Sequence, residues 1–180
     1  MPVTMLINDG KGTFTNQTAH YGLDKSNGFW NCLEIKDLNQ DGQPELIVGN
    51  LGANHSFEIT QEQPMLAYQA DFDDNGSKET IINHYIDGDY WPLPRKEVLS
   101  SVLPAIKKNY LSNRAYGTAK LEDLFSQEQL ENAAKYQVFE TRSGIFQLKD
   151  GKYSFQPFEN YAQLFPVFDI AVYSADADQF

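Results

Sequence analysis

The loop Asp37-Leu38-Asn39-Gln40-Asp41-Gly42-Gln43-Pro44-Glu45, which runs into Leu46-Ile47-Val48-Gly49-Asn50, decides how the chain is interpreted. Oxygen-bearing side chains occupy positions 1, 3, 5 and 9 of this loop, and a glycine at position 6 lets the backbone turn back over its contents. Calcium takes about six to eight oxygen ligands, which such a loop can supply. The stretch therefore predicts a calcium-binding loop.

The same pattern returns at Asp71-Phe72-Asp73-Asp74-Asn75-Gly76-Ser77-Lys78-Glu79, before Thr80-Ile81-Ile82-Asn83-His84-Tyr85. The two loops begin 34 residues apart, which indicates an internal repeat. Clusters of Asp, Asn and Gly are also ordinary turn formers. Two loops in register, each closed by a glutamate and followed by a strand pattern, favour calcium over simple turns.

The EF-hand is excluded as an explanation of these loops. It requires a glutamate at position 12 and a helix on each side, whereas position 12 is Val48 in one loop and Ile82 in the other. The residues that follow both loops are β-branched and apolar, which is typical of strands. A catalytic metal keeps an open coordination position, whereas these loops are closed by protein oxygens, so we expect a structural role for the ion.

The pattern Asp-x-Asn-x-Asp-Gly-x-x-Glu-Leu-Ile-Val-Gly-Asn resembles the FG-GAP/VCBS repeat, the blade unit of integrin-α-type β-propellers. Residues 6–15 are similar to the hairpin that precedes such loops in this family. Within the family, the chain looks like the large VCBS-repeat proteins of Bacteroidetes-type bacteria, which often also carry an ASPIC/UnbV domain. The resemblance implies two structural calcium sites and neither catalytic nor cofactor-binding residues. The implied ligands are Asp37, Asn39, Asp41, the carbonyl of Gln43, and Glu45 in the first site, and Asp71, Asp73, Asn75, the carbonyl of Ser77, and Glu79 in the second.

Composition narrows the class of partner. The formal net charge of −11 argues against nucleic acid, which needs a basic face; the acidity serves solubility, or a bound cation neutralises part of it. No stretch contains close to the about 18 consecutive apolar residues that a membrane-spanning helix needs, so direct membrane insertion is not expected. Cys32 is the one cysteine, which excludes an intramolecular disulfide and predicts a small buried residue.

Both ends of the chain favour a fragment of a longer protein. Residues 1–4 lack the basic and apolar regions of a signal peptide. Residues 174–180 resemble the start of a third calcium loop, with Asp176 and Asp178 but without its glycine. The family resemblance implies an extracellular, cell-surface or periplasmic parent protein.

The periodicity of apolar residues predicts a mainly β chain with a helical insertion. We expect blades with both calcium loops over residues 1–91, a helical insertion over 92–136, and a further blade over 137–180. Strands are predicted at 30–36, 45–48, 65–70, 80–86, 89–91, 138–142, 145–148, 153–155 and 166–173, with a hairpin over 3–15 and a turn-rich surface segment over 49–54. Within the insertion, Pro104 predicts a kink or two short helices, residues 121–125 suit a helical turn, and Ser126 with Gln129 predicts a capped helix over 127–135.

The expected architecture is thus a partial β-propeller of about three blades, with a compact α+β domain as the alternative. Because an open arc of blades leaves unpaired edges, we expect self-association through those edges, or frayed ends.

No catalytic motif stands out in the sequence. His20, His55 and His84 are scattered, and Asp87 and Asp89 flank a predicted hairpin turn rather than forming a carboxylate pair for glycoside chemistry. The aromatic residues Tyr85, Tyr90 and Trp91 either stack on a sugar or pack under the helices.

We therefore predict a non-enzymatic calcium-stabilised module of a bacterial surface or secreted protein that binds a protein or a polysaccharide. The alternatives are a fragment of a carbohydrate-active propeller enzyme whose catalytic residues lie outside this chain, or a purely architectural piece.

Overall fold

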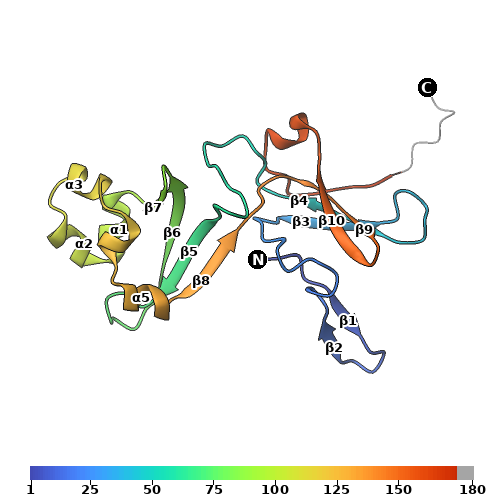
Figure 1. The fold of residues 1–180 in the computed structure, drawn as a ribbon, viewed down its shortest axis with the longest axis horizontal. Helices are drawn as coiled ribbons and strands as arrows, with labels where there is room; N and C mark the ends of the chain where they lie inside the picture. The colour runs from blue at the N-terminus through green and yellow to red at the C-terminus, as the bar shows by residue number, and fades with distance from the viewer. Residues whose placement is uncertain (174–180) are drawn as a thin grey trace. The chain divides into compact units, whose positions relative to one another are not determined.

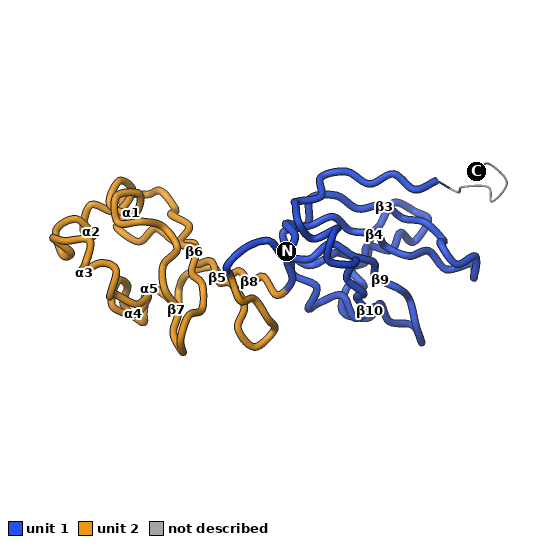
Figure 2. Tube along the Cα trace, turned by 90° about the horizontal axis from the view of Figure 1, so that it is seen from above, with its two compact units in different colours: residues 1–56, 140–180 blue, residues 57–139 orange. Residues whose placement is uncertain are grey.

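A computed structural model describes residues 1–173 of the chain, so the predicted third loop at Asp176 and Asp178 lies outside the described residues. Contacts between residues divide the chain into two compact units (Figure 2). Unit 1 contains residues 1–56 and the chain from residue 140 onward, and unit 2 contains residues 57–139. Each predicted calcium loop therefore belongs to a different unit, and the predicted helices lie in the same unit as the second loop.

Unit 1 is built on an antiparallel sheet with the strand order β10-β9-β4-β3 (Figure 1). Its strands are β3 (Cys32–Lys36), β4 (Glu45–Gly49), β9 (Gly144–Lys149) and β10 (Lys152–Pro157), and a separate hairpin joins β1 (Leu6–Asn8) to β2 (Phe14–Asn16). All five residues of β4 are buried, as its apolar sequence predicts for a central strand. Leu46 of β4 pairs with Phe146 of β9, and both lie in the core of this unit.

Unit 2 combines an antiparallel sheet, in the order β7-β6-β5-β8, with short helices. The strands are β5 (Met65–Ala70), β6 (Glu79–Ile86), β7 (Asp89–Pro92) and β8 (Ala134–Val138). The helices are α1 (Lys96–Val102), α2 (Pro104–Asn109), α3 (Asn113–Gly117), α4 (Leu121–Leu124) and α5 (Gln127–Asn132). Ile81 of β6 packs with Leu99, Leu103 and Ile106 in one hydrophobic core, so the helices cover one side of the sheet.

These elements confirm the mainly β class with a few helices. They also confirm the break at Pro104, which begins α2 directly after α1, and the capping box of Ser126 and Gln129 at the start of α5. The sheets of the described residues are open, with two edge strands each, and do not close into a propeller.

The strand predicted at 138–142 is wrong, because β8 covers Ala134–Val138 and pairs with β5. Beyond it, residue 140 forms an isolated bridge with Gly28, and two backbone carbonyls bind a side chain rather than a neighbouring strand. The side-chain NH₂ group of Asn50 donates to the backbone carbonyls of Glu140 (3.0 Å) and Arg142 (3.3 Å). Asn50 is fully buried, which also corrects the prediction that residues 49–54 form a surface turn.

The buried strand predicted at 166–173 is also wrong for the described residues, which belong to no sheet there. Phe168 is 71% exposed and Tyr173 is 85% exposed. The segment is attached through the amide of Val167, which donates to the carbonyl of Asn50 at 2.9 Å. Beside it, Cys32 is half-buried rather than buried.

Candidate metal centres

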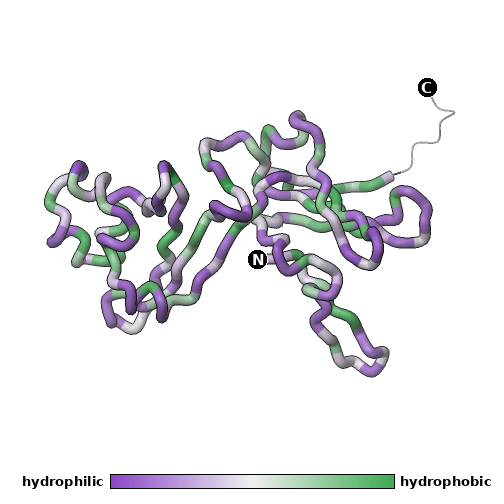
Figure 3. Tube along the Cα trace, viewed as in Figure 1, coloured by the Kyte–Doolittle hydropathy of each residue, from purple (hydrophilic) through white to green (hydrophobic). Residues whose placement is uncertain are grey.

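The first predicted calcium loop connects β3 to β4 and is closed by its own side chains. The carboxylate of Asp37 accepts from the amides of Asp41 (3.2 Å) and Gly42 (2.9 Å). Asp41 accepts from the backbone N–H of Gln43, at position 7 (2.7 Å), and Glu45 accepts from the backbone N–H of Leu38, at position 2 (2.8 Å). Figure 3 shows a hydrophilic loop between the more hydrophobic strands β3 and β4. These bonds turn the backbone around the acidic side chains.

The second loop, between β5 and β6, repeats this pattern position by position. Asp71 accepts from the backbone N–H groups of Asn75 (3.0 Å) and Gly76 (2.7 Å). The side chain of Asn75 accepts from the backbone N–H of Ser77, at position 7 (2.7 Å). Glu79 accepts from the amide of Phe72 at 3.1 Å. The internal repeat of the sequence is therefore also a repeat of conformation.

Both loops place positions 4 and 6 in the left-handed region of the backbone. The φ angles are 60° at Gln40 and 85° at Gly42, and 58° at Asp74 and 87° at Gly76. A glycine adopts this conformation without the steric cost that a side chain brings, which explains why position 6 is glycine in both loops.

The acidic groups of the second loop converge. One carboxylate oxygen from each of Asp71, Asp73 and Glu79 lies within 4.8 Å of the others. Like charges at this spacing repel, and a divalent cation among them converts the repulsion into attraction. An all-oxygen set of donors suits a hard cation such as Ca²⁺ or Mg²⁺.

In the first loop, an amide replaces one of these carboxylates. Asn39 stands at position 3, where its NH₂ group donates to Asp41 (3.0 Å) and Glu45 (3.3 Å). Its amide oxygen accepts from the backbone N–H of Asp41 at 2.9 Å and keeps a second lone pair. The backbone carbonyls at position 7, Gln43 and Ser77, accept no hydrogen bond from another described residue.

Glu45 is the most buried of the predicted calcium ligands. It is 2% exposed, and it forms no ion pair with any residue among 1–173, where the ion pairs join Lys120 to Asp89 and Arg142 to Glu140. A buried carboxylate is costly unless an opposite charge or several donors compensate it. The residues of both loops fit a bound cation, and they would hold it through the carboxylate, amide and carbonyl oxygens named above.

The histidines lie apart, as their scatter in the sequence predicts. His20 contacts Tyr21, His84 contacts Phe57, and the ring of His55 lies 2.9 Å from the hydroxyl of Thr141. In the described part of the chain, no group of potential metal-binding residues includes a histidine.

The two acids at the β6–β7 turn have different surroundings. Asp89 forms an ion pair with Lys120 at 2.8 Å, which also raises the pKa of that lysine. Asp87 occupies the turn itself, with a φ of 50°. Of the nearby aromatic residues, Tyr90 packs against the helical core and contacts Tyr85 edge-on at 5.3 Å, whereas Trp91 lines a cavity.

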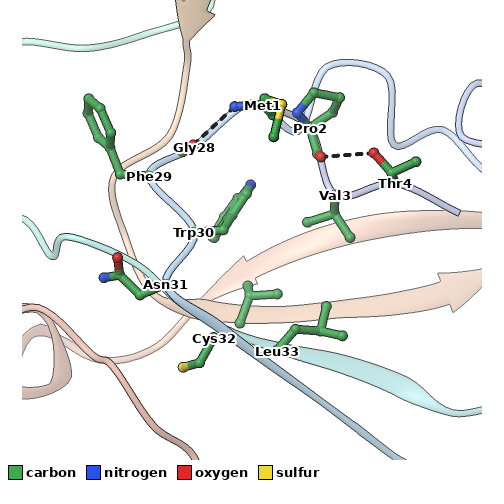
Figure 4. Close-up of a pocket in the computed structure, with 11 residues that line it drawn as sticks. Met1, Pro2, Val3, Thr4, Gly28, Phe29, Trp30, Asn31, Cys32 and Leu33 are labelled. Carbon is green, nitrogen blue, oxygen red and sulfur yellow. Dashed lines mark hydrogen bonds between the residues drawn. The ribbon is translucent and has the colours of Figure 1, made fainter.

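A larger cavity of about 470 Å³ lies beside β3 in unit 1 (Figure 4). Its apolar lining includes Val3, Trp30, Leu33 and Val48. The indole N–H of Trp30 donates to the carbonyl of Ser26 at 2.7 Å. The lining contains no Asp, Glu, His, Lys or Arg, so it offers no acid–base pair from side chains.

Among the described residues, no helix is both long and apolar enough to cross a membrane. Comparisons with protein-family models, with curated proteins and with solved structures find no match for this chain.

Proposed function

We propose that this chain is a calcium-stabilised β module related to FG-GAP/VCBS propeller blades, and that it serves a bacterial surface or secreted protein as a non-enzymatic unit for binding a protein or a polysaccharide. The observation that carries the proposal is the repeated loop. Both copies share four equivalent hydrogen bonds and two left-handed backbone positions. Turn formation alone needs neither the closing glutamate nor the burial of Glu45.

Calcium contributes stability in this proposal rather than chemistry. Extracellular calcium modules bind the ion with dissociation constants of about 10⁻⁴–10⁻³ M. At about 1 mM calcium, each occupied site would then stabilise its unit by about 0.4–1.4 kcal/mol. Sites of this affinity would fill only where calcium is millimolar, so the proposal places the parent protein outside the cell or in the periplasm.

Thermal unfolding in about 1 mM calcium, in equal magnesium and in excess chelator tests the proposal. We expect calcium to raise the melting temperature by a few degrees above chelator, and magnesium to raise it less, because Mg²⁺ demands a tighter octahedral site. The variants Glu45→Gln and Asp71→Asn should each remove part of the calcium effect. Asp150→Asn is the matched control, because Asp150 also has a left-handed backbone, with a φ of 51°, but lies in the β9–β10 turn. Equal melting temperatures with calcium and chelator would contradict the proposal.

A further inference from the structure

A cavity in unit 2 combines an aromatic ring with unpaired polar side chains. It has a volume of about 370 Å³, at the lower end of the about 300–1,000 Å³ typical of small-molecule sites. The β6–β7 hairpin and the end of α3 form it, and the buried residues Tyr116 and Ala119 contribute to its lining. Its other lining residues used below are His84, Asp87 and Trp91.

The strand register places His84 and Trp91 together. They are direct cross-strand partners in the β6–β7 ladder, so their side chains leave the same face of the sheet with Cβ atoms about 4.5–5.5 Å apart. The indole N–H of Trp91 donates to the carbonyl of Ile86 at 3.2 Å. The indole N–H is the only polar group of this half-buried side chain, and it is already hydrogen-bonded. A ligand can therefore contact only the aromatic surface of the ring.

Two polar groups beside this ring have no hydrogen-bond or ion-pair partner in the described part of the chain. The imidazole of His84 contacts the ring of Phe57, with centroids 5.6 Å apart, but forms no hydrogen bond. Asp87 forms neither a hydrogen bond nor an ion pair, whereas the neighbouring acid, Asp89, is neutralised by Lys120. The cavity therefore has a solvent-exposed carboxylate and a half-buried imidazole, neither hydrogen-bonded to another described residue, next to an indole.

The protonation of His84 supports a ligand that both donates and accepts hydrogen bonds. Burial lowers the pKa of its imidazole, so the ring is neutral at pH 7 and presents one donor and one acceptor. An apolar ligand would bury Asp87 and His84 without partners, which is costly. An organic cation would satisfy Asp87 and Trp91, but it would leave the N–H donor of His84 without an acceptor.

We propose that this cavity binds one ring of a neutral saccharide. The C–H face of the sugar packs on the indole of Trp91, its hydroxyls donate to the carboxylate of Asp87, and His84 exchanges hydrogen bonds with a further hydroxyl. This inference deepens the proposed function by naming a ligand class and a place for it. It does not depend on bound calcium for any of its contacts.

Fluorescence titration of a Trp30→Phe variant tests the inference, because the chain has two tryptophans and Trp91 is then the one reporter. The probes are tetraoses from cellulose, xylan, starch, mannan and chitin, each raised to about 20 mM, where even weak millimolar binding is visible. We expect at least one tetraose to change the emission of Trp91 saturably. In the same background, Asp87→Asn should weaken that binding by about tenfold, which corresponds to the loss of one charge-assisted hydrogen bond.

The controls separate this inference from a folding defect and from the calcium proposal. Asparagine tolerates the φ of 50° at position 87, so the turn is retained. Asp150→Asn changes the equivalent residue of the β9–β10 turn, where φ is 51°, and should leave saccharide affinity unchanged. Three results would overturn the inference: no tetraose changes the emission, the Asp87→Asn variant binds as well as its parent, or tetramethylammonium binds more tightly than every tetraose. Calcium-dependent melting, measured on the same samples, reports independently on the proposed function.

Discussion

Replacing Phe72 with alanine should uncouple the second predicted calcium loop from the helices of unit 2. Phe72 is position 2 of that loop, yet it is 8% exposed and belongs to the core formed with the helices. Its ring centroid lies 4.4 Å from that of Phe125, and its carbonyl accepts from the side chain of Gln129 at 3.0 Å. Leu38, at the same position of the first loop, is 41% exposed and provides a matched control.

The expected loss in the free energy of unfolding is severalfold larger for Phe72→Ala than for Leu38→Ala. Truncating a buried phenylalanine to alanine costs about 3–5 kcal/mol, whereas a change at an exposed position costs about 0.5 kcal/mol. The free energy of unfolding of a domain is about 5–15 kcal/mol, so Phe72→Ala removes a large share of the stability of unit 2. Urea unfolding in saturating calcium, followed by far-ultraviolet circular dichroism, measures both variants.

Hydrogen exchange then locates the effect along the chain. In the Phe72→Ala variant, amides of residues 96–132 should exchange faster, while those of β4 and β9 should be unchanged, because the latter lie in unit 1. Equal losses of stability in Phe72→Ala and Leu38→Ala would refute the reasoning. So would unchanged exchange in the helices, since the buried ring would then not be what connects loop and helices.

Further predictions concern single residues. Glu45→Gln should raise stability in chelator, because it removes the charge of a residue that is 2% exposed, and lower the calcium-induced rise in melting temperature, as measured by parallel melts. Gly52→Ala should destabilise the chain by more than about 2 kcal/mol in urea unfolding, because φ is 90° and the added Cβ would lie 2.6 Å from the carbonyl oxygen of Gln163. In contrast, Gly117→Ala, in α3 with open space around it, should stabilise the chain by about 0.5–1 kcal/mol in the same assay. Burial raises the pKa of Tyr116 to about 12. Because the unfolded tyrosine loses its proton near pH 10, the free energy of unfolding should fall by about 1.4 kcal/mol per pH unit between pH 10 and 12, and Tyr116→Phe should remove this part of the slope in melts from pH 8 to 12.

The elements next to the two loops were predictable because several local signals agree there. The loops fix where β4 and β6 begin, and the apolar residues that follow indicate strands. The same holds for Pro104 and for the capping pair at the start of α5, whose effects are confined to neighbouring residues. The hydrogen bonds inside each loop join residues at most seven positions apart, so the sequence carries almost all the information needed to predict them.

Other features depend on partners that are distant in the sequence. Residues 138–142 resemble a strand, but only Val138 belongs to one, and the carbonyls of Glu140 and Arg142 bind the buried side chain of Asn50. The apolar run at 166–173 lacks a neighbouring strand among the described residues, and hydrophobicity alone does not supply one. The cavity at Trp91 arises from the cross-strand register with His84 and from the approach of α3, and α3 itself, at Asn113–Gly117, has no marked amphipathic pattern.

The sheet of unit 1 is assembled from strands that precede unit 2 in the sequence and strands that follow it, so it is completed late in biosynthesis. Strand β4 pairs with β9, so Leu46 meets Phe146 only after the whole of unit 2 has been translated. Until then, the apolar strand β4 has one uncovered edge and is prone to aggregate. Unit 2 is continuous in sequence, and its β5–β8 pairing brings Met65 next to Val138. If unit 2 folds first on the ribosome, it shortens the effective loop between β4 and β9 and lowers the entropic cost of completing unit 1.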